Sequence, residues 1–101
     1  MKPLEVRVPV DHPAFAGHFP GQPLLPGVSL LALVLEAALA DPVLRAEVCS
    51  APRLGAAKFL APVGPGATLT VHLDPAPTAL RFEVRDGARV AASGHYERAA
   101  T

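Results

Sequence analysis

The chain has 101 residues, which is enough for one domain and too short for two of ordinary size. Half of the residues are hydrophobic and only 18% are charged, which excludes an intrinsically disordered chain. Nine basic residues balance nine acidic ones with no basic run, so we expect no nucleic-acid binding through a phosphate-neutralising patch. The single cysteine, Cys49, cannot form an internal disulfide, and we expect it to be a small buried apolar residue.

No membrane segment is expected. The first ten residues contain charges and prolines rather than the apolar core of a signal peptide. The longest apolar run, Leu30 to Leu35, is too short to cross a bilayer. The sequence therefore predicts a soluble cytoplasmic protein with no membrane partner. A chain this short and this apolar is also expected to bury surface against another copy.

The first half of the chain reads as a strand, a loop and a helix. From Leu4 to Val10, every second residue is leucine or valine, which predicts a strand with one buried face. Residues 11–26 hold four prolines and two glycines, which predicts an ordered, largely extended loop. From Val28 to Ala40, strong helix formers predict a helix that is apolar on every side and wrapped inside the domain. Its only charged residue is Glu36.

The second half reads as a mixed segment over residues 41–51 followed by four strands. We expect these strands at Leu54–Leu60, Thr68–Leu73, Leu80–Val84 and about Arg89–Arg98. Asp86-Gly87 is a strong hairpin signal between the last two. A strand, a loop, one helix and an antiparallel meander predict a single α+β domain over residues 1–101.

The most informative segment is GHFPGQPLLPGV, Gly17 to Val28. Its pattern, G-H-F-P-x-x-P-x-x-P-G-V before an apolar helix, resembles the signature of the FabA/FabZ-type 3-hydroxyacyl-[acyl-carrier-protein] dehydratases. A second segment, Lys58-Phe59-x-x-Pro62-Val63-x-Pro65-Gly66, is similar to another motif of that family, where Asp usually stands in place of Ala67. The resemblance implies the hotdog fold, an antiparallel sheet wrapped around one long central helix.

The residues of the first motif suit a dehydration. Removing water from a 3-hydroxyacyl thioester needs a base for the C2 proton, a group that holds negative charge on the thioester oxygen, and an acid for the leaving hydroxyl. His18 can serve as the base, since histidine titrates near neutral pH. The N–H groups of Gly27 and Val28 at the helix start are candidates to hold the oxygen. The alternative for His18 is a structural loop histidine with a hydrogen-bonded ring.

The helix lacks the acid that the resemblance implies. The family usually carries glutamate or aspartate fourteen residues after the histidine, and this chain has Ala32 there. Glu36 lies four residues further, on the same helix face and about 6 Å along the axis. It is the candidate acid. Alternatively, Glu36 lies near an exposed helix end or pairs with an arginine such as Arg45 or Arg53.

The resemblance implies a reaction and its partners. The substrate would be a (3R)-hydroxyacyl chain on an acyl carrier protein, or an acyl-CoA thioester, and the product the trans-2-enoyl thioester. The protein would be a homodimer or a dimer-based oligomer, with His18 of one chain facing the helix of the other. No separate cofactor is implied, because phosphopantetheine arrives with the carrier protein, and no HxH or HxxxH pair predicts a metal site. The expected substrate-binding residues are Phe19, Pro26, Gly27, Val28, Leu31, Ala32, Leu35 and Phe59.

Two other functions fit the same frame. A non-catalytic or accessory hotdog subunit that binds acyl thioesters is favoured by Ala32 and opposed by the intact His18 loop. A hotdog thioesterase is less favoured, since many use a helix carboxylate to activate water.

Overall fold

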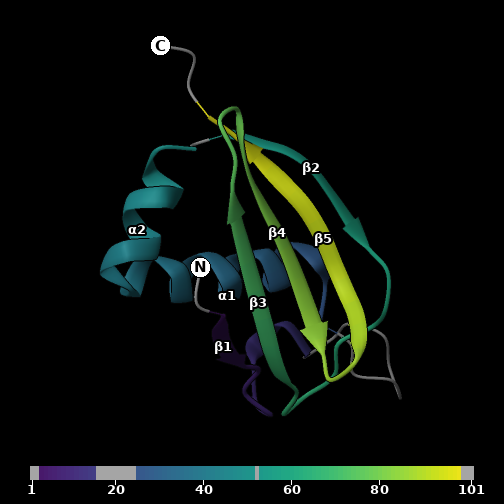
Figure 1. The fold of residues 1–101 in the computed structure, drawn as a ribbon. Helices are drawn as coiled ribbons and strands as arrows, with labels where there is room; N and C mark the ends of the chain where they lie inside the picture. Colours follow the sequence, from purple (N-terminus) through teal and green to yellow (C-terminus); the bar gives the residue numbers. More distant parts are fainter. Residues whose placement is uncertain (1–2, 16–24, 52, 99–101) are drawn as a thin grey trace.

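The computed structural model describes residues 3–15, 25–51 and 53–98, and orders them into five strands, two α-helices and a 3-10 turn. Figure 1 shows α1 crossing behind the sheet, with α2 beyond one edge. The 3-10 turn η1 lies within residues 11–26, the segment predicted to be a largely extended loop. In chain order the elements are β1 Leu4–Arg7, η1 Pro13–Phe15, α1 Gly27–Ala40, α2 Pro42–Cys49, β2 Arg53–Phe59, β3 Thr68–Pro75, β4 Ala79–Asp86 and β5 Arg89–Glu97.

The sheet is antiparallel, with the strand order β1-β3-β4-β5-β2. The predicted meander is correct for β3, β4 and β5 but wrong for β2, which pairs with β5 at the far edge. The segment after β2 therefore crosses to the other edge of the sheet. Two hydrogen bonds fix its end there: the Val8 N–H donates to the Ala67 carbonyl (2.8 Å) and the Gly66 N–H donates to the Val8 carbonyl (2.9 Å).

The core lies between α1 and one face of the sheet. The alternation predicted for β3 and β4 is confirmed, since every second side chain of each strand is buried. Burial of these apolar side chains away from water is the main force that holds the helix on the sheet. The buried residues that α1, β3 and β4 contribute are Leu30, Val34, Ala38, Leu69, Val71, Leu73, Leu80, Phe82 and Val84.

The helix is not wrapped on every side, contrary to the prediction. Val28 is 82% exposed, and Ala32 and Glu36 are exposed as well. Residues four apart lie on one face of a helix, so these three form a stripe along α1. One five-stranded sheet covers a single face of the helix and leaves this stripe in solvent.

A second helix, α2, lies in the segment that the sequence left unassigned. The Asp41 carboxylate accepts hydrogen bonds from the N–H groups of Val43 (2.9 Å) and Leu44 (3.2 Å), and Pro42 stands in the first turn. Asp-Pro therefore ends α1 and also caps the start of α2. Cys49, expected to be buried, is exposed at the end of this helix.

Among the described residues, neither α1 nor α2 is by itself long and apolar enough to cross a membrane. Only the two together, bent by 119° at their junction, reach such a length and composition.

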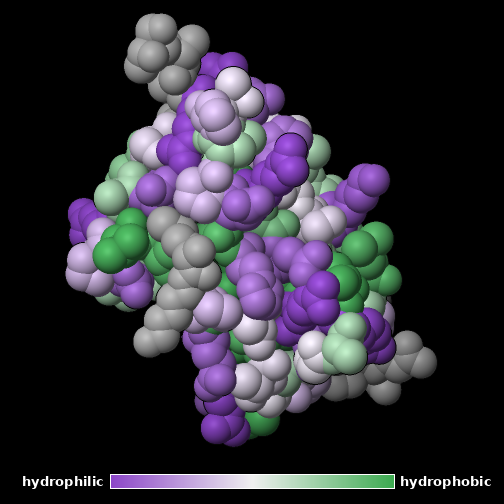
Figure 2. All heavy atoms as spheres, in the orientation of Figure 1, coloured by the Kyte–Doolittle hydropathy of each residue, from purple (hydrophilic) through white to green (hydrophobic). Residues whose placement is uncertain are grey.

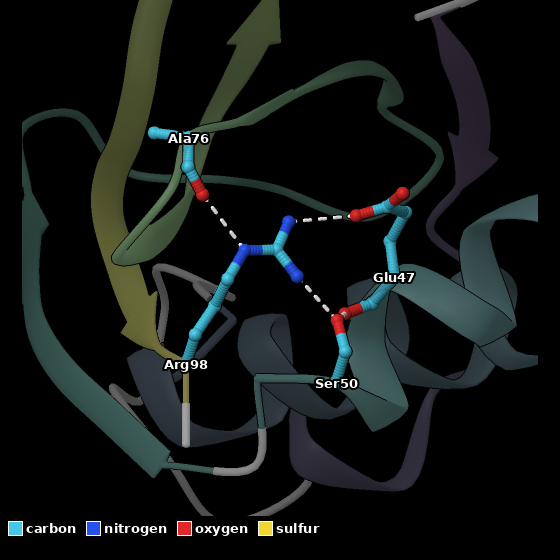
Figure 3. A network of polar contacts seen from close by, with 4 residues as sticks. All are labelled: Glu47, Ser50, Ala76 and Arg98. Carbon is cyan, nitrogen blue, oxygen red and sulfur yellow. Dashed lines mark hydrogen bonds and ion pairs between the residues drawn. The ribbon is translucent and has the colours of Figure 1, made fainter. Parts of the chain in front are cut away.

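Arg98 ties α2 to the sheet (Figure 3). Its guanidinium donates to the Ala76 carbonyl (2.8 Å), to a Glu47 carboxylate oxygen (2.7 Å) and to the Ser50 hydroxyl. The Arg98 and Glu47 side chains are both partly buried, so water screens this ion pair less than an exposed one. The network joins the end of β5, the β3–β4 turn and the end of α2.

We expect Arg98→Ala to lower the free energy of unfolding by about 1–3 kcal/mol, because three acceptors lose a charged donor. Urea denaturation followed by circular dichroism measures the change. Arg89→Ala is the matched control: Arg89 faces Asp86 at 3.6 Å and its side chain is 59% exposed, so its loss should cost less than about 0.5 kcal/mol. Equal losses in the two variants would contradict a stabilising role for the Arg98 network.

Candidate functional site

The two sequence motifs meet in one apolar pocket of about 290 Å³ at the start of α1. A hydrogen bond from the Leu25 N–H to the Val63 carbonyl (2.8 Å) holds the first motif against the second. Sequence reasoning named three of the lining residues, Pro26, Gly27 and Phe59. It missed the others, although the second motif itself contains Pro62 and Val63. The full lining is Leu25, Pro26, Gly27, Leu30, Phe59, Leu60, Ala61, Pro62 and Val63.

The start of α1 lines this pocket with Pro26, Gly27 and Leu30. The helix begins at Gly27, and the Leu30 N–H donates to the Pro26 carbonyl (3.0 Å) to close the first turn. No described side chain caps this end of the helix. The N–H groups of the first turn have no acceptors within a helix, and the helix dipole makes this end partly positive. The arrangement can hold a partly negative oxygen in apolar surroundings.

The Phe59 ring packs directly on Gly27. A β-carbon on residue 27 would lie 2.7, 2.8 and 2.9 Å from three ring carbons of Phe59, closer than nonbonded carbons come. Glycine is therefore required at position 27 as long as the ring stays where it is. Phe59 fills the space beside Gly27 on the side where a β-carbon would stand.

The remaining predicted site residues do not all converge on this pocket. His18 and Phe19 lie outside the described residues, so their predicted roles stay predictions. Val28 and Ala32 are exposed on the α1 stripe, and Leu31 and Leu35 are partly buried along the helix. None of these four lines the pocket. Their contact with an acyl chain stays a prediction.

Glu36 is exposed on α1. At 1.5 Å per residue it stands about 13.5 Å along the axis from Gly27, whereas Ala32 stands about 7.5 Å away. Within the described part of the chain, Glu36 forms no ion pair with Arg45 or Arg53, so the predicted arginine pairing is wrong there. Its carboxylate is open to solvent or to another chain.

A larger open groove, of about 730 Å³, lies on the sheet face turned away from α1. Figure 2 shows hydrophilic residues gathered over this face. Lys58, Arg81 and Arg85 contribute positive charge, and Asp74 and Glu83 contribute negative charge, with Arg85 paired to Glu83. Lys58 and Phe59 are neighbours on β2 and line different cavities, since successive side chains of a strand point to opposite faces. The groove holds none of the predicted site residues, so the smaller pocket is the better candidate.

The other histidines take no part in the pocket at α1. His12 meets Phe15 edge-on, with ring centroids 6.2 Å apart. His72 is exposed on the outer sheet face, as expected. The His95 ring lies over Gly55, where a β-carbon would be 2.3 Å from its Nε2 atom, so His95 packs against the β2 backbone. Within residues 3–15, 25–51 and 53–98, no three His, Cys, Asp or Glu side chains converge on a metal position.

We expect Gly27→Ala to destabilise the protein by about 0.5–1.5 kcal/mol, because the new methyl group forces the Phe59 ring off its preferred rotamer. In a Phe59→Ala background the same substitution should cost nothing, since the obstructing ring is gone. Thermal unfolding of the four proteins in this cycle measures the coupling. Leu54→Ala, on the same strand but outside the pocket, is the control and should add independently to Gly27→Ala. If the destabilisations from Gly27→Ala and Phe59→Ala simply added in the double variant, the contact between the two residues would be contradicted.

Comparison with known proteins identifies similar chains. Residues 2–95 match the model of the ApeI-like family, described as ApeI dehydratase. A structure described as the dehydratase heterocomplex ApeI:P from Xenorhabdus doucetiae superposes with a TM-score of 0.75 at 28% identity, covering 97% of this chain and 86% of that one. An uncharacterised protein from Erwinia carotovora gives a TM-score of 0.68 at 32% identity, covering 94% and 79%. These matches confirm the predicted hotdog fold.

Curated relatives carry the name 3-hydroxyacyl-[acyl-carrier-protein] dehydratase FabZ. The protein of Gluconacetobacter diazotrophicus is 32% identical over 74 residues, which cover 67% of this chain and 46% of that protein. The protein of Chlamydia trachomatis is 39% identical over 74 residues, which cover 67% and 48%. The chain thus spans about half the length of the curated relatives that it matches.

Proposed function

The chain belongs to the ApeI-like dehydratase family, and from this premise we propose that it removes water from a (3R)-hydroxyacyl thioester on an acyl carrier protein. The observation that carries the proposal is the pocket at the start of α1. There both motifs of the FabA/FabZ resemblance meet beside helix N–H groups that no described side chain caps. Such a pocket suits the thioester end of an acyl chain.

The proposed reaction starts at C2 of the substrate. His18 takes the C2 proton, and the electron pair of the broken C–H bond moves toward the thioester carbonyl. The N–H groups of Gly27 and Val28 hold the negative charge that develops on the carbonyl oxygen. The electron pair then forms the C2–C3 double bond, and the C3 hydroxyl leaves with a proton as water. The product is the trans-2-enoyl thioester, and no resident cofactor takes part in the proposed reaction.

The proton for the leaving hydroxyl needs a donor, and Ala32 cannot supply one. We assign this role to Glu36, the one ionisable side chain of α1. The C3 hydroxyl lies close to the thioester oxygen that Gly27 holds, whereas Glu36 stands nine residues further along the helix. We therefore propose that Glu36 delivers its proton through water held over Ala32. The stripe then forms the floor of the site, and Leu31 and Leu35 lie at its sides.

A second subunit would cover this stripe. Val28 is 82% exposed at one end of the stripe, and Leu54, Phe59 and Leu60 are exposed on or just after the edge strand β2. An unpaired strand edge and exposed apolar side chains favour association with another chain. We propose a dimer whose interface holds the substrate, with His18 of one subunit facing α1 of the other.

We expect His18→Ala to reduce turnover of a 3-hydroxybutyryl-carrier-protein thioester by about 10²-fold or more, because the base is lost. Mass spectrometry of the carrier protein follows the reaction in both directions, and circular dichroism checks that the fold is kept. His72→Ala, an exposed histidine on the outer sheet face, is the control and should keep full activity. A His18→Ala variant that kept full activity would exclude His18 as the base.

Glu36→Gln should also lower turnover by about 10²-fold or more if Glu36 is the acid. Adding Ala32→Glu to this variant should recover activity, because it places a carboxyl on the same stripe one turn nearer the pocket. The matched control is Glu5→Gln, an exposed glutamate on β1 that should have no effect. A loss of less than about threefold for Glu36→Gln would exclude it as the general acid.

An accessory subunit is the second candidate, because Ala32 removes the helix acid and one structural neighbour is a dehydratase heterocomplex. In that case the chain binds acyl thioesters and a different hotdog subunit supplies the acid. The purified chain would then show thioester binding without turnover, and activity would appear only when the partner is added.

A further inference from the structure

Phe59 lies where a substrate would meet the start of α1. The three atoms nearest to the β-carbon position of Gly27 are all carbons of the Phe59 ring, at 2.7–2.9 Å. Carbon atoms in favourable contact are about 3.5–4.0 Å apart, so the ring leaves no room for a carbon at the β-carbon position of residue 27. Gly27 and Phe59 line the same pocket, so a substrate group held there would contact the ring.

The side chains that line the pocket differ in how easily a ligand could displace them. Leu25, Leu30 and Val63 are buried members of the hydrophobic core, where close packing resists displacement. Phe59 is 50% exposed, so its ring has solvent on one side and can turn outward. The ring is therefore the wall that a substrate group beside Gly27 would displace.

We infer that Phe59 sets the substrate specificity of this pocket, by accepting straight acyl groups and excluding those branched at C2. The inference rests on the proposed dehydration, in which C2 adjoins the thioester carbonyl held by Gly27. The volume of about 290 Å³ is at the small end for ligand pockets, so a branch has little other space. A methyl group on C2 must push the ring outward, whereas an unbranched C2 needs less of this space.

The test compares kcat/KM for 3-hydroxybutyryl and 2-methyl-3-hydroxybutyryl pantetheine thioesters. We expect the unsubstituted protein to prefer the straight substrate by about 10-fold or more, the usual effect of one extra carbon in a tight apolar pocket. Phe59→Ala should lower this ratio by about 10-fold, mainly through a lower KM for the branched substrate. Phe59→Leu should give an intermediate ratio.

Val43→Ala is the control for this test. Val43 is 64% exposed on α2 and does not line the pocket, so its removal should leave the ratio unchanged. An unchanged ratio in Phe59→Ala would overturn the inference, since it would mean that the ring does not select between the substrates.

Failure of the proposed function is distinguishable from failure of this inference. If the unsubstituted protein dehydrates neither substrate, the function fails, and selectivity is measured instead as Kd for butyryl and 2-methylbutyryl pantetheine amides. A preference for the straight amide that is lost in Phe59→Ala supports the role of Phe59. Equal Kd values for the two amides, or binding of neither, would overturn it.

Discussion

The segment that joins β2 to β3, residues 60–67, is the constraint on which the rest of the structure depends. It carries the chain from one edge of the sheet to the other and is held by backbone hydrogen bonds to Leu25 at one point and Val8 at another. Gly66 has φ +76°, a conformation that glycine adopts with little strain, where the segment meets Val8. Because of this crossing, β3 pairs with β1, and β2 is left as an edge strand beside β5.

The same segment builds the candidate site. Phe59 precedes it and Val63 lies within it, so fixing the segment fixes both against the start of α1. The second motif therefore forms one side of the pocket, and Pro26 and Gly27 of the first motif form the other side. A pocket with a buried floor and an exposed aromatic wall follows from this one placement.

The sequence predicted most of the fold from simple periodicity. The alternation in β3 and β4, the Asp86-Gly87 turn with Gly87 at φ +63°, and the helix Val28–Ala40 agree with the structure within one or two residues at most positions. The position of β2 was not predictable from periodicity, because strand order depends on long-range hydrogen bonds such as Val8–Ala67. Helix α2 is not predicted because Asp41 both ends α1 and caps α2, so the same Asp-Pro pair that signals the end of one helix also begins the next.

The helix-start N–H groups of the site could be predicted from the sequence. The exposure of side chains along the helix could not, because it depends on how the sheet packs against α1. A glycine at a helix start indicated available N–H groups, and the structure places Gly27 in a pocket with Phe59. The exposure of Ala32 and Glu36 could not be predicted, because an apolar helix sequence does not reveal how much of its surface one sheet covers.

The exposure of this stripe determines how alanine in place of an acid at position 32 affects stability. A carboxylate on a fully buried helix would carry a desolvation cost that its partners must offset, so its loss would favour stability. On a stripe open to solvent, an acid at position 32 would lose little hydration when a single chain folds. Replacing it with alanine would therefore change the folding free energy of the single chain little. The apolar Ala32 instead extends the apolar surface that begins at Val28, which favours burial against another chain. The stripe therefore combines an apolar first half with a single carboxylate at Glu36. In the proposed dehydration, the acid must then come from further along α1 or from a second subunit.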